Sequence, residues 1–251
     1  MNEPIVTLPG SKPAKSIKPG KPKRKWPLWV RLPLWIAFWL IVGPILWVAL
    51  YAFMPVPGTY LMVQRAFQGD HIQRQGVSIN NISPHLVRAV MAGEDAKFCA
   101  HHGFDVEAIQ KALKNNARGR KLRGGSTISQ QTAKNLFLWP QRSWLRKGFE
   151  AYFTVLMEVL WPKRRIMETY LNAAEWGDGV FGAELAARAN FGKFARDLTR
   201  TEAARLAAIL PSPNKWSADA PGPLVRSRTA RILGNMRVIE NEGLAACVLR
   251  K

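Results

Sequence analysis

Two groups of polar residues in this sequence have the types and spacing that chemistry on an anionic substrate would need. The first is the carboxylate pair Glu94-Asp95, which ends an apolar stretch and precedes the segment FCAHHGFD. A carboxylate at the boundary between an apolar helix and a glycine-containing loop can act as a proton acceptor. The alternative is that both carboxylates lie in water at an ordinary helix end.

The second group is the segment GGSTISQQTAKN at residues 124–135. Its glycine pair lets a ligand approach the backbone closely, and either Ser126 or Thr127 can cap the helix that follows. The N–H groups of a helix N-terminus, with Lys134 further along, suit an anion such as a phosphate. An ordinary loop and helix cap would explain the same residues.

A third set, Arg142, Arg146 and Glu150, repeats every four residues and therefore lies along one side of a predicted helix. Most such sets are surface ion pairs worth less than about 1 kcal/mol. Because this set comes shortly after Lys134, it also fits a composite site for an anion.

The overall charge points to an anionic partner as well. The chain has 37 Lys and Arg against 17 Asp and Glu, a net charge of +20. Residues 1–31 hold eight basic residues and one Glu, or +7, which leaves +13 for the remainder. This charge suits lipid headgroups, a phosphorylated substrate or nucleic acid.

The cysteines and histidines suggest neither a disulfide framework nor a zinc site. Cys99 and Cys247 are the two cysteines of the chain, and nothing in the sequence requires them to lie together, so we do not expect a bridge between them. The four histidines form no zinc-binding motif. We therefore expect no protein-bound metal.

The segment 32–53 is a predicted membrane anchor. Its 22 residues carry no charge, and at about 1.5 Å per residue a helix of this length spans roughly 33 Å, the thickness of a bilayer's hydrocarbon core. A buried core helix or a cleaved signal peptide are the alternatives, although the apolar run is long for a signal peptide. Basic residues cluster before the segment, so the positive-inside rule predicts a cytoplasmic N-terminus.

We therefore divide the chain into a disordered basic cytoplasmic tail (1–31), a transmembrane helix (32–54) and one mostly helical domain (55–251). No alternating pattern indicates strands. In the domain, helices are predicted after Ser83 and Asp105, after Thr127, over about 143–161, after Pro162, and at about 183–190, 201–210 and 223–242. In the long helix at 143–161 we expect Phe149, Phe153, Leu156 and Leu160 to be buried.

Four segments resemble, in order and spacing, the motifs of the peptidoglycan glycosyltransferases, which occur alone or joined to penicillin-binding domains. They are EDAKFCAHHGFD (94–105), GGSTISQQTAKN (124–135), RKGFE (146–150) and KRRIMETYLN (163–172). The resemblance extends over roughly residues 55–240. With its single anchor, the chain is most similar to the monofunctional biosynthetic enzymes of Gram-negative bacteria.

This resemblance implies a mainly α fold, with a lysozyme-like helical head and a smaller membrane-proximal jaw. The implied activity is the polymerisation of lipid II into β-1,4-linked glycan strands, with release of undecaprenyl diphosphate. In this family Glu94 matches the general base, which deprotonates the acceptor sugar. Glu150 matches a second carboxylate, which orients or supports the leaving group.

Other positions match the family's substrate-binding residues. Lys134 and Arg142 match the cations that hold the donor diphosphate. Ser126, Gln130, Gln131 and Asn135 match polar residues that line the donor groove. Asp95, His101 and Asp105 match positions that support the base.

The resemblance also implies partners and a location. The substrates would be lipid II and the growing glycan strand, with membrane lipid as a further contact, no nucleic acid, and other wall-synthesis or division proteins as candidate partners. The location would be the bacterial inner membrane, with the catalytic domain in the periplasm. No cofactor is required, although Mg²⁺ or Mn²⁺ could assist the diphosphate. The alternative functions are a lytic glycosidase acting on peptidoglycan and a tethered binding protein without catalytic activity.

Overall fold

The structure is a computed structural model that describes residues 27–117, 125–141 and 143–250. Most of the predicted tail lies outside these residues. The chain divides into two compact units, residues 1–40 and residues 41–251. The described residues are predominantly helical, which confirms the predicted fold class.

Helix α1 (Leu28–Phe53) contains the predicted membrane anchor and begins one turn earlier than expected. It is long and apolar enough to cross a membrane. Its last part, from Ile41 onward, belongs to the second unit and packs within it. There Val48 is fully buried, and its carbonyl accepts a hydrogen bond of 2.8 Å from the indole Nε1 of Trp161.

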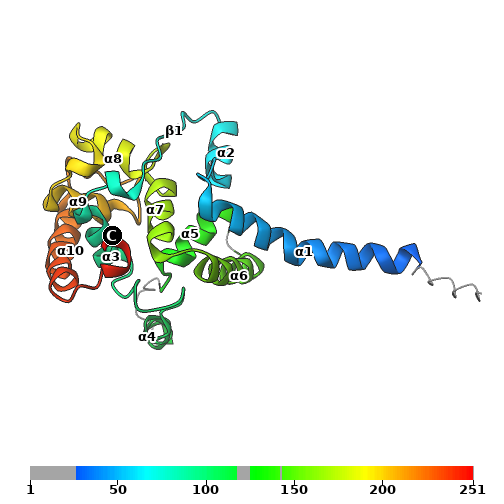
Figure 1. The fold of residues 1–251 in the computed structure, drawn as a ribbon. Coiled ribbons are helices and arrows are strands. Elements are labelled where there is room, and N and C mark those ends of the chain that lie inside the picture. The colour runs from blue at the N-terminus through cyan, green and yellow to red at the C-terminus, as the bar shows by residue number, and fades with distance from the viewer. Residues whose placement is uncertain (1–26, 118–124, 142, 251) are drawn as a thin grey trace, which may run out of the picture. The chain divides into compact units, whose positions relative to one another are not determined.

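The remaining helices all belong to the second unit. They are α2 (Tyr60–Phe67), α3 (Pro84–Glu94), α4 (Val106–Ala117), α5 (Ile128–Phe137), α6 (Trp144–Leu160), α7 (Lys163–Ala173), α8 (Ala183–Phe191), α9 (Arg200–Ile209), α10 (Pro223–Asn241) and α11 (Ala246–Leu249), with 3-10 turns at Ile79–Asn81 and Ala195–Asp197. Helix α7 runs through the middle of this unit, where it packs against α5, and α5 in turn packs against α6 (Figure 1). Helices α3, α9 and α10 pack against one another.

Capping side chains explain where several of these helices begin. The Ser83 hydroxyl accepts from the His85 N–H at the start of α3, and Asp105 accepts from the Ala108 N–H at the start of α4. Thr127 and Gln130 form a reciprocal capping box at α5. The predicted starts of α3, α4 and α5 are therefore confirmed.

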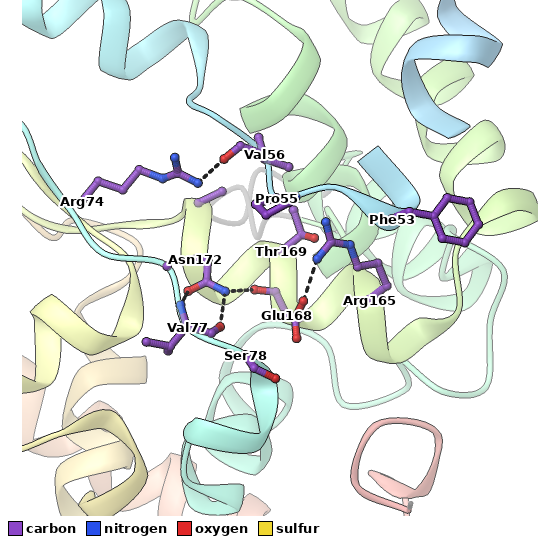
Figure 2. A pocket seen from close by; sticks show the side chains of 12 residues that line it. Phe53, Pro55, Val56, Arg74, Val77, Ser78, Arg165, Glu168, Thr169 and Asn172 are labelled. Carbon is purple, nitrogen blue, oxygen red and sulfur yellow. Dashed lines mark hydrogen bonds and ion pairs between the residues drawn. The ribbon is translucent and has the colours of Figure 1, made fainter. Parts of the chain in front are cut away.

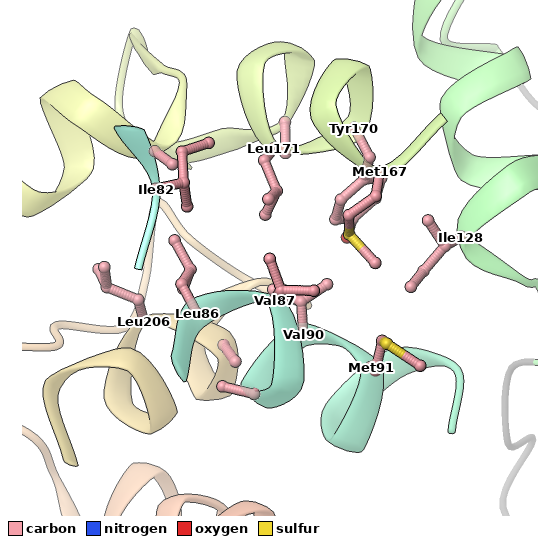
Figure 3. Packing of buried hydrophobic residues seen from close by; sticks show 14 of the residues in the cluster. Ile82, Leu86, Val87, Val90, Met91, Ile128, Met167, Tyr170, Leu171 and Leu206 are labelled. Carbon is pink, nitrogen blue, oxygen red and sulfur yellow. The ribbon is translucent and has the colours of Figure 1, made fainter. Parts of the chain in front are cut away.

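The core between α3 and α7 positions the Glu94-Asp95 pair. Figure 3 shows Leu86, Val90 and Met91 of α3 facing Met167 and Leu171 of α7, all of them buried. Close packing of such interiors leaves little freedom for the helix axes. This packing fixes α3 beside α7, and hydrogen bonds from α5 to Glu94 and Asp95 hold the C-terminal end of α3 beside α5.

A small sheet joins two distant parts of the chain, although no strand was predicted. Strand β3 (Val180–Phe181) lies between β1 (Gln73–Arg74), which is parallel to it, and β2 (Glu175–Gly177), which is antiparallel. The prediction was wrong because strands of two or three residues are too short to show an alternating pattern.

The expected burial along α6 was only partly right. Phe153 is buried and Leu156 is half-buried, but Phe149 is 43% exposed and Leu160 is 37% exposed. The helix carries apolar residues on two faces, and only one face packs against α5. Trp144, Val155 and Val159 are also exposed.

Cys99 and Cys247 form a disulfide bond, with their Cα atoms 5.7 Å apart. The expectation that they would not pair was wrong. Helix α11 packs against α7 at the end of the chain and so brings Cys247 to the loop that follows α3. This contact joins residues 148 positions apart, and no local pattern could reveal it.

Candidate active site

The two neighbouring carboxylates at the end of α3 have different surroundings. Asp95 is buried, and its Oδ2 accepts a hydrogen bond of 3.0 Å from the Ile128 N–H at the start of α5. Its two oxygens also lie 3.0 and 3.1 Å from His101 Nε2. Glu94 is half-buried, and its Oε2 accepts a hydrogen bond of 3.0 Å from Gln131 Nε2. The Asp95 carboxylate thus stabilises the fold through these bonds, whereas the Glu94 carboxylate remains partly accessible to solvent.

His101 links Asp95 to Gly103 in the loop between α3 and α4. Its Nδ1 accepts a hydrogen bond of 3.2 Å from the Gly103 N–H, so Nε2 carries a proton and donates it to Asp95. The Gly103 carbonyl in turn accepts a 2.7 Å bond from the hydroxyl of Thr127, the cap of α5. This network fixes the N-terminus of α5 beside the end of α3.

Tyr170 orients the amide that contacts Glu94. The Tyr170 hydroxyl lies 3.4 Å from Gln131 Oε1, and the other end of the same amide donates to Glu94. Burial raises the pKa of the Tyr170 phenol well above its ordinary value, and the charges of Glu94 and Asp95 raise it further. The phenol therefore stays protonated and can donate to Gln131.

A groove of about 180 Å³ opens beside this chain of hydrogen bonds. Gln131, Lys134, Asn135 and Tyr170 line it from α5 and α7. Successive turns of α5 place Gln131, Lys134 and Asn135 on one face of that helix, since residues three and four apart are neighbours. The groove thus combines an ammonium group, two amides and a phenol with the carboxylate of Glu175, which also lines it and pairs with Arg65 at 2.7 Å. The Glu94 carboxylate lies one hydrogen bond away from the groove.

Arg228 of α10 adds a second cation near Glu94. Burial lowers the pKa of its guanidinium, while the negative charge of Glu94 acts in the opposite direction. Arginine remains protonated in proteins, so Arg228 places a positive charge within electrostatic reach of the carboxylate. The sequence analysis missed Arg228 because the pattern around it is that of any amphipathic helix.

Several predicted site residues do not reach this groove. Gln130 is buried, and its Oε1 accepts a bond of 3.0 Å from the Thr127 N–H within the capping box. Ser126 is exposed just before that cap, and neither it nor Gln130 is among the described residues that line the groove. Arg142 lies outside the described residues.

Glu150 lies on α6 and is buried among basic side chains. Its Oε2 accepts a bond of 2.9 Å from Arg146 Nη1, and its Oε1 pairs with Lys147. Arg146 and Glu150 therefore lie on one side of α6 as the spacing predicted, and they form a buried ion pair where most sets with this spacing form surface pairs. The described lining of the groove does not include Glu150.

A further buried ion pair supports the loop after Asp95. Lys163 Nζ lies 2.8 Å from Glu158 Oε1 and donates a 2.6 Å bond to the His101 carbonyl. The Ser129 hydroxyl also bonds to Glu158. Sequence reasoning missed the Lys163–Glu158 pair, although Lys163 opens one of the quoted motifs.

Within the described part of the chain, no group of three or more His, Cys, Asp or Glu side chains is placed to hold a metal ion. Among the described side chains, Glu94 is a half-buried carboxylate one hydrogen bond away from a groove that carries the ammonium group of Lys134.

Comparison with known proteins gives a consistent result. Residues 61–237 match the transglycosylase family. A protein of Caulobacter vibrioides named biosynthetic peptidoglycan transglycosylase is 55% identical over 83% of this chain and 91% of its own length. Proteins with the same name from Rhodospirillum centenum and Pseudomonas aeruginosa are 56% and 53% identical, each over 79% of this chain and 87% and 88% of their own lengths. The chain therefore belongs to the transglycosylase family.

Proposed function

We propose that this chain is a peptidoglycan glycosyltransferase that polymerises lipid II into β-1,4-linked glycan strands, with Glu94 as the general base. The observation that carries the proposal is the hydrogen bond between Glu94 and Gln131. It joins a carboxylate to a groove that Lys134 also lines. A base next to a groove that presents an ammonium group is what transfer from a diphosphate donor requires.

In the proposed reaction, Glu94 takes the proton of the acceptor sugar's 4-hydroxyl. The resulting oxygen nucleophile attacks the anomeric carbon of the donor from the face opposite the diphosphate. A new C–O bond forms while the bond to the diphosphate oxygen breaks, so the configuration inverts and undecaprenyl diphosphate leaves with the bonding electrons. Lys134, and by resemblance Arg142, would stabilise the negative charge that grows on this leaving group.

The other polar residues have supporting roles in this proposal. Gln131 and Asn135 would hydrogen-bond the donor from the groove, whereas the burial of Gln130 favours a structural role. Ser126 would contact the donor from the exposed loop before α5. Glu150 would act as a positioning residue, because its ion pair holds Arg146 in the turn of α6 that follows Arg142.

We also propose that the domain lies on the periplasmic face of the bacterial inner membrane, with the N-terminus in the cytoplasm. Helix α1 fits a single-pass anchor. The exposed apolar residues of α6, including Leu145 and Val159, would sit in the bilayer surface near the lipid substrate. The Cys99–Cys247 bridge supports a location outside the cytoplasm, because cytoplasmic thiols are kept reduced.

The substrates of the family are lipid II and the growing glycan strand. The proposal needs no protein-bound cofactor, and Mg²⁺ or Mn²⁺ carried on the donor diphosphate would add to the positive charge that Lys134 supplies in the groove. Other wall-synthesis and division proteins are proposed partners, whereas the outward orientation makes nucleic acid an unsuitable one.

The test is to incubate the detergent-solubilised protein with labelled lipid II and to follow both polymer and released undecaprenyl diphosphate. We expect wild type to form polymer and Glu94→Gln to lose at least about 100-fold in rate, which is the usual contribution of a general base. Glu242→Gln is the matched control. It makes the same chemical change at an exposed position at the end of α10 and should leave the rate unchanged.

Two outcomes would contradict the proposal. If lipid II stays intact while finished glycan strands are cleaved, the chain is a lytic glycosidase. If Glu94→Gln polymerises as fast as wild type, another group is the base.

A further inference from the structure

A second pocket lies across α7 from the candidate active site. It has a volume of about 310 Å³, and Ala173 is the one residue that it shares with the lining of the groove. Figure 2 shows Thr169 and Arg165 extending from α7 toward the connector that carries Pro55. The proposed reaction uses none of these side chains.

The unpartnered hydroxyl of Thr169 is the first feature that indicates a ligand site in this pocket. Thr169 is 4% exposed, and its Oγ1 is buried without a hydrogen-bond partner in the described part of the chain. Three other buried helical threonines, Thr132, Thr154 and Thr229, donate to the carbonyl four residues earlier at 2.6 to 2.8 Å. Thr169 does not make this hydrogen bond, and it lies where α7 lines the pocket. A buried hydroxyl without a partner destabilises the fold, so a ligand that accepts a hydrogen bond from it would remove that penalty.

Arg74 is the second sign. Its guanidinium donates to the carbonyls of Val56 and Pro57, but its Nε is buried without a partner. Among the ion pairs of the described residues, none includes Arg74. Burial lowers the pKa of this guanidinium, as expected for a cation without a nearby carboxylate.

The charges that face the pocket favour an anion. Arg165 pairs with Glu168 at 2.6 Å and also donates to the carbonyls of Tyr51 and Met54. Since Arg165 and Glu168 cancel, Arg74 leaves the lining with a net charge of 2 − 1 = +1. The unpartnered Nε–H and hydroxyl are both groups that can donate to phosphate oxygens.

The position of the pocket indicates where such a phosphate comes from. Phe53, the last residue of α1, lines the pocket and is 90% exposed, and Pro55 and Val56 follow it in the lining. If α1 crosses the membrane, the pocket lies at the depth of the lipid headgroups, with apolar side chains beside it for the start of an acyl chain.

We propose that this pocket binds the phosphate of an anionic phospholipid headgroup, with Arg74 and Thr169 as its donors. The site would fasten α7 and the connector after α1 to the membrane surface. The proposal rests on α1 as an anchor and not on the reaction at Glu94, so either can fail without the other.

The test uses the full chain in nanodiscs of phosphatidylcholine alone or mixed with phosphatidylglycerol. We expect phosphatidylglycerol to raise the melting temperature of wild type by about 2–4 °C. Thr169→Val keeps the shape and removes the unpartnered hydroxyl. This variant should melt higher than wild type in phosphatidylcholine and gain less from phosphatidylglycerol. Arg74→Gln should also lose the gain, and native mass spectrometry should find less phosphatidylglycerol retained on both variants.

Arg226→Gln is the matched control, because Arg226 also donates to a proline carbonyl but lies exposed on α10. It removes the same charge and keeps the same basic tail, so it should respond to phosphatidylglycerol as wild type does. Equal gains in wild type, Thr169→Val and Arg74→Gln would overturn the proposal. If 10 mM inorganic phosphate stabilises wild type in phosphatidylcholine and abolishes the lipid effect, the site binds a soluble anion and the lipid assignment is wrong.

Discussion

For Glu94 and Asp95, the residue pattern predicted the position of the two carboxylates but not their separate roles. The sequence located the pair at a helix end, and a family resemblance was needed to choose Glu94 as the base. The structure adds a physical reason for this choice, because Asp95 holds the Ile128 N–H and His101 while Glu94 meets only the amide of Gln131 among the described hydrogen bonds. These partners lie up to 37 residues away, beyond the reach of any local pattern.

Asp95→Asn should therefore act on stability. An asparagine can replace one acceptor but loses the charge that strengthens the bonds to Ile128 and His101. Hydrogen bonds to charged groups contribute about 1.5–3 kcal/mol, so we expect a loss of about 2–3 kcal/mol in the free energy of unfolding. Chemical denaturation of the detergent-solubilised chain measures it. Asp197→Asn, at an exposed carboxylate, is the control, and equal stability of the two variants would contradict the role given to Asp95.

Tyr170 should make stability depend on alkaline pH. Its pKa is raised in the folded chain by burial and by Glu94 and Asp95, whereas an unfolded tyrosine ionises near pH 10. Above about pH 10 the unfolded state binds fewer protons than the native state. The free energy of unfolding therefore falls as pH rises above about 10, by up to about 1.4 kcal/mol per pH unit. Below about pH 10 Tyr170 is protonated in both states, so it causes no loss of stability there.

Melting curves from pH 8 to 11 test this dependence. Wild type should lose more stability above pH 10 than Tyr170→Phe, which has no phenol to ionise. Tyr60→Phe, at an exposed position, should follow wild type. If the melting temperatures of wild type and Tyr170→Phe fall in parallel with pH, the pKa of the Tyr170 phenol is not raised in the folded chain.

At the scale of elements, helices with clear caps were predictable and the connections between them were not. Ser83, Asp105 and Thr127 mark helix starts in the sequence and cap them in the structure. The two adjacent glutamines of α5 were both assigned to the groove, although the spacing from Thr127 to Gln130 is that of a capping box. In the structure Gln130 caps the helix and Gln131 lines the groove. Strand β1 pairs with a partner more than 100 residues later, and a contact of that range leaves no local signal.

Gly179 should be indispensable to this sheet. It has a φ of +69° in the turn between β2 and β3, and an added Cβ would lie 2.4 Å from the His71 carbonyl oxygen. A backbone atom cannot move aside easily, so Gly179→Ala should lower the free energy of unfolding by more than about 1 kcal/mol. Gly234→Ala, in the middle of α10 with open space around it, should raise stability by about 0.5–1 kcal/mol. Unchanged stability in Gly179→Ala would show that the turn can relax.

At the scale of the whole molecule, the disulfide ties the C-terminal helix α11 to the loop that follows Glu94 and Asp95. Closing a loop of 148 residues restricts the unfolded chain strongly, and such bridges typically contribute about 2–5 kcal/mol. Reduction with dithiothreitol should therefore lower the melting temperature of wild type. Cys247→Ser should melt near the reduced wild type and be insensitive to the reagent. If the melting temperature of wild type is the same before and after reduction, the disulfide does not stabilise the fold.

The same bridge allows the orientation of the chain to be tested in living cells. Cys99 and Cys247 are the two cysteines of the chain, so a maleimide coupled to polyethylene glycol reports on this bridge alone. If the domain faces the periplasm, rapid acid trapping followed by denaturation should leave the protein unlabelled, and prior reduction should add two labels. A domain in the cytoplasm would keep both thiols reduced and take up two labels without reduction. Cys99→Ser calibrates the shift that one label produces. Two labels on unreduced wild type would overturn the periplasmic assignment, and with it the route by which the groove beside Glu94 meets its lipid substrate.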